Sequence, residues 1–384
     1  MKDNQAKYPQ LRFKCFTDPW EQRKLEKLVD VRSGHDYKHL NRGNIPVYGT
    51  GGYMLSVDKA LSENEDAIGI GRKGTIDNPF LLKAPFWTVD TLFYVVPRVD
   101  YNLNFVNSIF QKINWKKYDE STGVPSLSKS TINSVIISFP SYEEQKQIGT
   151  FFQQLDKTIA LHQRKLTKLK ELKQGYLQKM FPKNGSKFPQ LRFAGFADAW
   201  EQRKLGDLGD ILRKSIDPQL TPSREFVEYS MPSYDRGKRP NRVLGESMQS
   251  TRLKISGTVL LINKLNVRQR RIWFVKKAPE NAVASGEFVP FQSFEIDLGF
   301  LHQLFLSDKT TSELQSISSG TSNSQKRVTP SDLLHYPICI PTTKGEQVVV
   351  GRFLSSIDNL ITLHQRKLEK LQELKKGYLQ KMFC

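Results

Sequence analysis

The residues with the clearest chemical potential in this chain lie in short loops that combine glycine with cations. Residues 69–74 read Gly-Ile-Gly-Arg-Lys-Gly, which satisfies the G-x-G-x-x-G pattern of dinucleotide-binding loops. Such a site also needs a helix whose N-terminus faces the pyrophosphate, whereas residues 75–80 are typical of a turn and a new strand. We therefore expect a tight loop that projects Arg72 and Lys73 toward a DNA phosphate or a guanine edge, with a solvated turn as the alternative.

Other polar segments have the composition of nucleic-acid contacts. Residues 264–277 hold six cations and no acid, and the Asn, Gln and Arg side chains there are types that read base edges. Residues 234–242 form a second basic stretch, punctuated by glycine and proline. Near the end of each half, residues 121–130 and 318–327 combine Ser, Thr and Gly with a cation, which lets backbone amides approach phosphate closely. A solvated face or a plain linker has a similar composition.

These segments supply the candidate DNA contacts. In the first half they are Arg72, Lys73, Thr75, Ser121, Thr122, Ser128 and Lys129; in the second half they are Tyr234, Arg236, Lys238, Arg239, Asn241, Asn263, Lys264, Asn266, Arg268, Gln269, Arg270, Arg271, Ser319, Thr321, Gln325, Lys326 and Arg327.

Catalytic and metal-binding patterns are poor in this sequence. It has no P-loop, residues 78–80 lack the second proline of an amino-methyltransferase motif, and no acid cluster resembles a nuclease metal site. His35 and His39 are four residues apart without a third ligand nearby, and His162 and His364 fall on an apolar helical stripe that favours a packing role. We therefore predict no catalytic residue, no metal site and no cofactor in this chain.

The net charge indicates the class of partner. Lys and Arg number 58 against 39 Asp and Glu, a formal charge of +19, which points to nucleic acid first and to a membrane surface second. No run of 18 apolar residues exists, the first residues lack an apolar signal core, and Cys15, Cys339 and Cys384 lie far apart. We expect a cytoplasmic protein without disulfides.

Two internal repeats frame two unlike inserts. Residues 9–25 recur at 189–205 with 13 of 17 positions identical, and residues 161–181 recur at 363–383 with 18 of 21 identical. The predicted segments are a repeat segment at 1–25, an insert at 26–142, a central helical region at 143–187, the second copy of the repeat segment at 188–205, a second insert at 206–344, and a distal helical region at 345–384. The inserts share almost no identity, so each has its own task while the frames share one.

The repeated helical regions carry a heptad seam. Its positions are Leu155, Ile159, His162, Leu166, Leu169 and Tyr176 in the first copy, and Ile357, Ile361, His364, Leu368, Leu371 and Tyr378 in the second, each interrupted by a lysine, Lys173 or Lys375. Leu172, Leu177, Leu374 and Leu379 are expected to widen this stripe. The two helices can pack on their own domains, but pairing with each other is the better interpretation because each apolar face is too short to be stable alone. A chain that holds two such helices around a globular insert pairs them most readily antiparallel.

The inserts are predicted to be mixed α/β. Strands are expected at 67–70, 87–96, 135–139, 259–262, 272–275 and 336–340, and short helices at 101–117 and 300–316. The fold class is therefore α+β, with two globular mixed α/β inserts separated by two long helices that pair as an antiparallel coiled coil in a pseudo-two-fold repeat.

The frames, the unlike inserts and the Leu-x-Gln-Arg-Lys-Leu helices at 161–181 and 363–383 resemble the specificity (S) subunit of bacterial Type I restriction-modification systems. The resemblance covers the whole chain. It implies that the inserts are two target-recognition domains that bind double-stranded DNA. It also implies recruitment of two modification (methyltransferase) subunits and, optionally, two restriction (translocase and endonuclease) subunits, and that S-adenosylmethionine, ATP and Mg belong to those partners.

This interpretation predicts a non-catalytic subunit in which each insert reads one half of a split, asymmetric site while the helices set the gap. A self-contained nuclease or methyltransferase with an unrecognised active site is one alternative. A coiled-coil scaffold with incidental charge is the other, and a steep loss of DNA affinity with salt would reject it.

Overall fold

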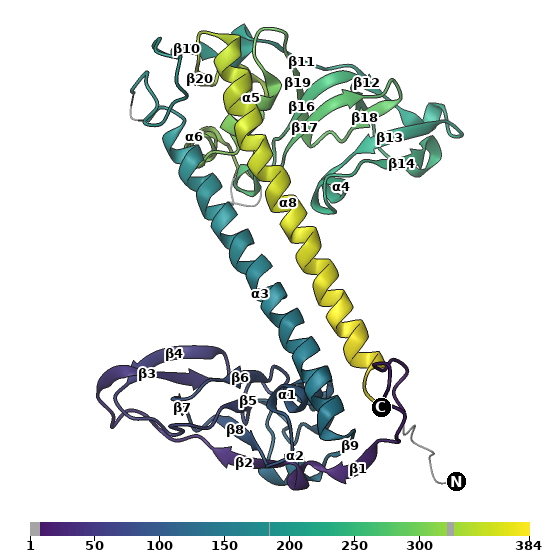
Figure 1. Ribbon diagram of the computed structural model, residues 1–384. Coiled ribbons are helices and arrows are strands. Elements are labelled where there is room, and N and C mark those ends of the chain that lie inside the picture. The colour runs from purple at the N-terminus through teal and green to yellow at the C-terminus, as the bar shows by residue number, and fades with distance from the viewer. Residues whose placement is uncertain (1–7, 184, 321–325) are drawn as a thin grey trace. The chain divides into compact units, whose positions relative to one another are not determined.

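The computed structural model describes residues 8–183, 185–320 and 326–384 (Figure 1). The chain divides into two compact units. Unit 1 comprises Met1–Arg164 with Gln365–Cys384, and unit 2 comprises Lys165–His364. Both long helices are therefore shared between the units, and each unit holds one insert with the start of one helix and the end of the other.

The repeated segments close each insert with a two-stranded antiparallel sheet. In unit 1, β1 (Glu21–Lys24) pairs with β9 (Ile136–Phe139), with Lys24 opposite Ile136. In unit 2, β10 (Glu201–Lys204) pairs with β20 (Pro337–Ile340), with Lys204 opposite Pro337. The start and the end of each insert are thus joined in the same register.

Each insert contains a four-stranded antiparallel sheet of the same topology. The order is β2 (Val29–Ser33), β8 (Leu92–Pro97), β5 (Ala67–Gly71), β6 (Phe80–Leu82) in unit 1, and β11 (Asp210–Ile211), β19 (Phe288–Gln292), β16 (Gly257–Asn263), β17 (Ile272–Ala278) in unit 2. The registers also correspond, because Ile68 faces Val95 where Leu260 faces Phe291. The internal repeat therefore runs through the inserts, although their residues differ.

The outer sheets distinguish the inserts. The first carries three strands, β4 (Gly52–Val57), β3 (Arg42–Gly49) and β7 (Trp87–Thr88), and the second carries five, β12 (Ser215–Ile216), β15 (Arg252–Lys254), β18 (Ala282–Ala284), β13 (Glu225–Tyr229) and β14 (Asn241–Leu244). The helix α4 (Met231–Asp235) precedes β14. The stretch between β2 and β5 holds 33 residues and that between β11 and β16 holds 45, so much of the length difference between the inserts lies in these outer parts.

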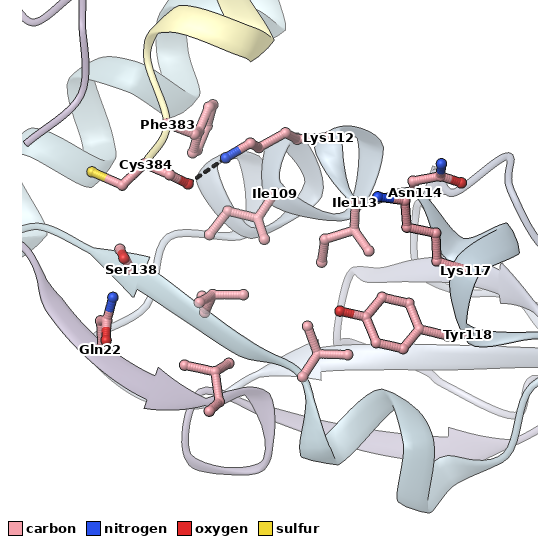
Figure 2. A pocket seen from close by; sticks show the side chains of 13 residues that line it. Gln22, Ile109, Lys112, Ile113, Asn114, Lys117, Tyr118, Ser138, Phe383 and Cys384 are labelled. Atoms are coloured by element: carbon pink, nitrogen blue, oxygen red, sulfur yellow. Dashed lines mark hydrogen bonds between the residues drawn. The ribbon is translucent and has the colours of Figure 1, made fainter. Parts of the chain in front are cut away.

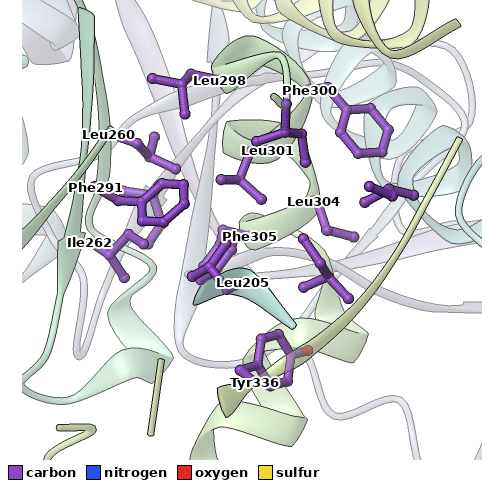
Figure 3. Packing of buried hydrophobic residues seen from close by; sticks show 14 of the residues in the cluster. Leu205, Leu260, Ile262, Phe291, Leu298, Phe300, Leu301, Leu304, Phe305 and Tyr336 are labelled. Atoms are coloured by element: carbon purple, nitrogen blue, oxygen red, sulfur yellow. The ribbon is translucent and has the colours of Figure 1, made fainter. Parts of the chain in front are cut away.

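Short helices cover the four-stranded sheets and build the cores. The helical stretches expected at 101–117 and 300–316 are each divided, into α1 (Leu103–Lys112) and the 3-10 turn Trp115–Tyr118, and into α5 (Leu298–Phe305) and α6 (Asp308–Ile317). Figure 3 shows Leu301 and Phe305 of α5 packed among Leu260, Ile262 and Phe291 of the sheet. Two six-residue helices, α2 (Lys129–Ser134) and α7 (Pro330–His335), precede β9 and β20.

The long helices α3 (Tyr142–Lys179) and α8 (Lys344–Lys381) pair antiparallel within each unit. In unit 1 the rings of Phe151 and Tyr378 are 5.1 Å apart, and in unit 2 those of Tyr176 and Phe353 are 4.9 Å apart. In unit 1 Asp156 also contacts Lys375, and in unit 2 Lys173 also contacts Asp358. Within each unit residue numbers therefore rise along α3 as they fall along α8, which confirms the predicted antiparallel orientation.

The predicted seam is confirmed by burial. Its members Leu155, Ile159, His162, Leu166, Leu169, Tyr176, Ile357, Ile361, His364, Leu368, Leu371 and Tyr378 are all buried or half-buried. Leu177 and Leu379 also pack on the cores. The prediction for Leu172 and Leu374 is wrong, because they are 47% and 43% exposed. Among the described residues, no helix has the length and apolarity required to cross a membrane.

Candidate nucleic-acid interface

In unit 1 the two predicted loops lie side by side. We call residues 72–76 with 119–129 paired-loop site 1. The Leu127 amide donates to the Arg72 carbonyl at 2.9 Å, and the Gly74 amide donates to the Pro125 carbonyl at 2.8 Å. Residues separated by about fifty positions in the sequence thus form one surface.

The backbone of this loop requires glycine at two positions of the G-x-G-x-x-G stretch, Gly71 and Gly74. A Cβ at Gly71 would lie 2.0 Å from the Thr75 carbonyl oxygen, and Gly74 has a φ of +97°. Strand β6, rather than a helix, follows the loop. The expected absence of a helix after the motif is confirmed, and the dipole that would hold a pyrophosphate is missing at this point.

The cations of site 1 border a hollow of about 490 Å³. The Arg72 guanidinium lies 5.9 Å from the centre of the Phe93 ring and 3.4 Å from the Asp90 carbonyl oxygen. Arg72, Lys73, Thr75, Thr122 and Lys129 are exposed, and Ser121 is half-buried. Such a concave, cationic surface suits a phosphate or a base edge.

Two acidic groups give site 1 its conformation. Asp119 accepts the Ser126 and Ser121 amides at 2.9 and 3.0 Å, and these hydrogen bonds lower the pKa of Asp119. Ser128 donates to Glu120 at 2.9 Å and accepts the Thr131 amide as the N-cap of α2. Its hydroxyl is therefore engaged in this local structure, and its role as a phosphate contact stays a prediction.

Unit 2 contains the same arrangement, which the sequence did not reveal. We call residues 264–271 with the described part of 318–327 paired-loop site 2. The Val328 amide donates to the Lys264 carbonyl at 2.9 Å, and the Asn266 amide donates to the Lys326 carbonyl at 3.0 Å. Lys264 therefore takes the place of Arg72. Asn266, with a φ of +50°, takes the place of Gly74, since asparagine tolerates this left-handed backbone.

A hollow of about 280 Å³ adjoins site 2, where Lys264, Arg213 and Arg252 supply cations. Sequence analysis missed both arginines. Extending the 180-residue offset of the first repeat beyond Leu205 would have placed Arg213 at the position of Ser33, which lines the hollow of site 1. Arg252 forms an ion pair with Glu228 at 2.8 Å. No local sequence pattern marks Arg252 as part of this hollow, because the two residues are distant in the sequence.

Three candidates near site 2 have partners within the protein. Buried Asn263 is corrected as a DNA contact, whereas Arg270 and Arg271 are half-buried and their role as DNA contacts stays a prediction. Asn263 is 2% exposed and its side chain accepts the Leu265 amide at 2.9 Å. Arg270 lies 2.5 Å from Asp308, and Arg271 binds both carboxylate oxygens of Asp235 at 2.8 and 2.6 Å. Hydrogen bonds from the two arginines lower the pKa of Asp308 and of Asp235.

The Tyr234 side chain is also structural. Its hydroxyl donates to the Arg270 carbonyl at 3.2 Å, and burial raises its pKa to about 12. The Lys238 ammonium lies 4.9 Å from the centre of the Tyr234 ring, and desolvation lowers the pKa of Lys238. Tyr234 is half-buried and Lys238 is exposed, so their role as DNA contacts stays a prediction.

The remaining candidates of the second insert are distributed as follows. Arg236, Arg239, Arg268, Gln269, Ser319 and Arg327 are exposed, Asn241, Lys264, Asn266 and Lys326 are half-buried, and Thr321 and Gln325 lie outside the described residues. Arg327 is 3.3 Å from Glu287. Site 2 brings together Lys264, Asn266, Lys326 and Arg327, whereas Arg236, Arg239 and Asn241 belong to the segment around α4 and β14.

Both paired-loop sites lie in segments that match one known protein family. A family model described as the Type I restriction modification DNA specificity domain matches residues 17–171 and again 197–373. The chain belongs to this DNA specificity family. Each match covers one insert with its following helix, so the two paired-loop sites are parts of two copies of the family's domain.

Individual relatives agree with this assignment. The chain is 26% identical over 334 residues to the Type I restriction enzyme MjaVIII specificity subunit of Methanocaldococcus jannaschii, covering 82% of this chain and 74% of the relative. It matches the crystal structure of a Type I restriction-modification S subunit from M. genitalium with a TM-score of 0.70 and 13% identity, over 98% of this chain and 99% of the other. The structural match shows that the fold is shared.

A Type I specificity subunit supplies DNA recognition to its system and is not itself catalytic. Among the described residues, no three His, Cys, Asp or Glu side chains form a group that could hold a metal ion. The family assignment favours DNA recognition over the enzyme and scaffold alternatives.

Proposed function

We propose that each insert of this specificity subunit reads one half of a split, asymmetric DNA site through its paired-loop site. The observation that carries the proposal is the recurrence of one loop pairing at the same place in both sheets with different side chains. Site 1 offers Arg72 and Lys73, and site 2 offers Lys264 with Lys326 and Arg327. Equal scaffolds with unequal side chains favour two half-sites of unequal sequence.

Binding preferences of single-site variants test this proposal. Arg72→Ala should relax the preference at a position in one half-site, and Lys264→Ala should relax the other half. A base contact is worth about 1–3 kcal/mol at one position, whereas a phosphate contact weakens all sequences and reduces the salt dependence. Selection of bound DNA from a randomised pool measures both effects. Unchanged preferences and affinities in both variants would reject the paired-loop sites as DNA contacts.

We further propose that the helix pair docks two modification subunits and sets the unread gap between the half-sites. Two leucines of α3, Leu161 and Leu172, are 64% and 47% exposed, and their repeats on α8, Leu363 and Leu374, are 48% and 43% exposed. Exposed apolar side chains at identical positions of both helices favour a protein partner that binds twice. Two restriction subunits would join optionally.

In this proposal the chemistry resides on the partners. S-adenosylmethionine would be bound by the modification subunits, ATP and Mg by the restriction subunits, and the complex would act in the cytoplasm. Mixing the purified chain with DNA, Mg²⁺ and S-adenosylmethionine, with and without the modification subunit, tests the division of roles. Methyl transfer by the chain alone would contradict it.

A further inference from the structure

Unit 1 contains a hollow of about 360 Å³ away from the residues of paired-loop site 1 (Figure 2). It is bordered by β9, by the end of α1, and by the residues that follow α8. Its wall combines apolar and polar side chains and is partly open to solvent, since Ile136 is 61% and Tyr118 is 37% exposed. Lys112 and Lys117 supply two cations, and no Asp or Glu is among the described residues that line it.

Unit 2 contains the corresponding hollow, of about 490 Å³. Gln202, Pro337 and Cys339 line it at the positions that Gln22, Ile136 and Ser138 occupy in unit 1. Its cations Lys187 and Lys309 exceed its single acid, Glu313. The inserts share almost no sequence identity, yet both build a hollow with exposed apolar side chains and a cationic excess at this place.

A lysine fixes the rim of each hollow in the same way. The Lys112 ammonium donates to the carbonyl of Cys384, which follows Phe383 (Figure 2). The Lys309 ammonium donates to the carbonyl of Pro182, which follows the repeated Phe181, at 3.3 Å. Phe383 and Phe181 are buried in the cores, so each hollow is attached rigidly to the end of a long helix.

We propose that each hollow receives an apolar and acidic segment of one modification subunit. An exposed apolar surface with cations and little opposing acid is complementary to such a segment. The proposal rests on the docking of modification subunits along the helices. Each hollow is lined by residues that follow a long helix, Phe383 and Cys384 in unit 1 and Ser186 and Lys187 in unit 2. Exposed Leu374 lies ten residues before Cys384, and exposed Leu172 lies ten residues before Pro182. Two equivalent hollows fit two copies of the partner.

Variants of exposed side chains test the hollows without disturbing the cores. Ile136→Glu with Lys117→Glu changes the hollow of unit 1, and Ile317→Glu with Lys187→Glu changes that of unit 2. The full chain is titrated with the purified modification subunit of the same system, and the bound copies are counted by native mass spectrometry and sedimentation. We expect two copies on the wild type, one on each hollow variant with at least ten-fold weaker binding of the second, and none on the combined variant.

Two comparisons separate this inference from the proposed function. Val99→Glu with Lys59→Glu matches the charge change at exposed positions outside the hollow and should bind two copies. Leu172→Glu with Leu374→Glu tests the helix face. If the helix-face variant loses the partner while the hollow variants bind two copies with wild-type affinity, helix docking stands and the hollow proposal is overturned. Loss of DNA affinity with full partner binding in the hollow variants would also overturn it.

Discussion

The ammonium of Lys173 on α3 lies 2.5 Å from the carboxylate of Asp358 on α8. Lys375 and Asp156, each 202 residues away in the other copy, make the same contact at 2.5 Å. Each unit thus holds this interhelical ion pair, and the lysine side chains are only 13% and 18% exposed. Each lysine that interrupts the seam is therefore paired with an aspartate of the other helix. This pairing favours the observed register of α3 against α8, because a shift would separate the opposite charges.

Removing one member of this pair should destabilise the protein more than removing both. Lys173→Met leaves a carboxylate in a half-buried seam and should cost about 1–2 kcal/mol, between the values of exposed and buried pairs. Because Asp358 also accepts a hydrogen bond from the buried Gln303 amide at 3.0 Å, the double variant is made at the equivalent pair. Lys375→Met alone should cost a similar amount, and Lys375→Met with Asp156→Leu should return close to wild-type stability. Urea unfolding measures the difference, with the exposed Lys168→Met as a control. A double variant as unstable as the single one would show that the pair itself stabilises the seam.

The two buried Arg–Glu pairs predict an unequal response to the same mutation. Arg12 donates to both oxygens of Glu144 at 2.7 Å, and Arg192 donates to both oxygens of Glu346 at 2.8 Å. Glu346 also accepts the Trp200 indole N–H at 3.2 Å, whereas the Trp20 indole nitrogen has no hydrogen-bond partner among the residues that the structure describes.

Arg12→Met should therefore cost about 3–5 kcal/mol, because Glu144 is 1% exposed and loses both charged donors. Arg192→Met should cost about 1–2 kcal/mol less, because Trp200 still donates to Glu346. Unfolding by urea compares the two variants. Equal losses, or a larger loss for Arg192→Met, would contradict the role assigned to Trp200.

His302 predicts a pH-dependent stability. The ring is 8% exposed, stacks on Phe274 at 6.2 Å, and lies 3.2 Å from the Ile272 carbonyl. Desolvation lowers its pKa to about 3. Below the unfolded pKa of about 6.5 the unfolded chain takes up a proton that the folded chain excludes, so stability falls as the pH decreases toward 3.

The contribution of this group is at most about 1.4 kcal/mol per pH unit. His302→Gln removes it, so the free energy of unfolding should change less between pH 6 and pH 4 than in the wild type. Urea titrations at each pH measure the two slopes. Parallel slopes would show that His302 is protonated in the folded protein.

The sequence predicted what local patterns determine and missed what distant contacts determine. The seam, the helix orientation and strands β5, β9, β16, β17 and β20 follow from periodicity and the repeats. The strand expected at 87–96 is divided into β7 and β8, and the Thr91 carbonyl between them accepts the Arg72 amide at 2.8 Å. That acceptor could not be recognised from local composition.

The candidate site shows the same limit. Paired-loop site 2 was hidden because Asn266, rather than glycine, takes the left-handed position. Arg270 and Arg271 resembled free cations because their acids, Asp308 and Asp235, lie 38 and 36 residues away. Composition gives the number of cations in a loop, whereas the folded structure decides which of them are neutralised.

In the second insert, a cation proposed to contact DNA and a cation paired with an acid should respond differently to substitution by alanine. Lys264→Ala should weaken DNA binding with little effect on folding. Arg271→Ala removes both hydrogen bonds to Asp235 and should lower stability by about 1 kcal/mol, with near-wild-type DNA affinity in the folded protein. Fluorescence anisotropy and urea unfolding of each variant check this contrast. Normal stability with lost DNA affinity in Arg271→Ala would reverse the assignment.

The spacer role of the helices predicts the effect of a paired insertion. At the register shared by the two interhelical ion pairs, a break after Arg164 lies opposite a break after Arg366. Seven residues added at both places preserve the heptad phase and lengthen the helices by about 10 Å. The unread gap should grow by about three base pairs, at about 3.4 Å each, while both half-sites stay the same. Mapping the methylated sites measures the gap, and an unchanged gap with intact activity would contradict the spacer role.

The most direct test of the account exchanges one insert. Residues 206–344 are replaced by the corresponding insert of a specificity subunit with a different known target, and the methylated sites are mapped across a genome in cells that express the complete system. We predict that one half of the recognised sequence changes to that of the donor while the other half and the gap are retained. A change in both halves, or in neither, would contradict the claim that each insert reads its own half-site.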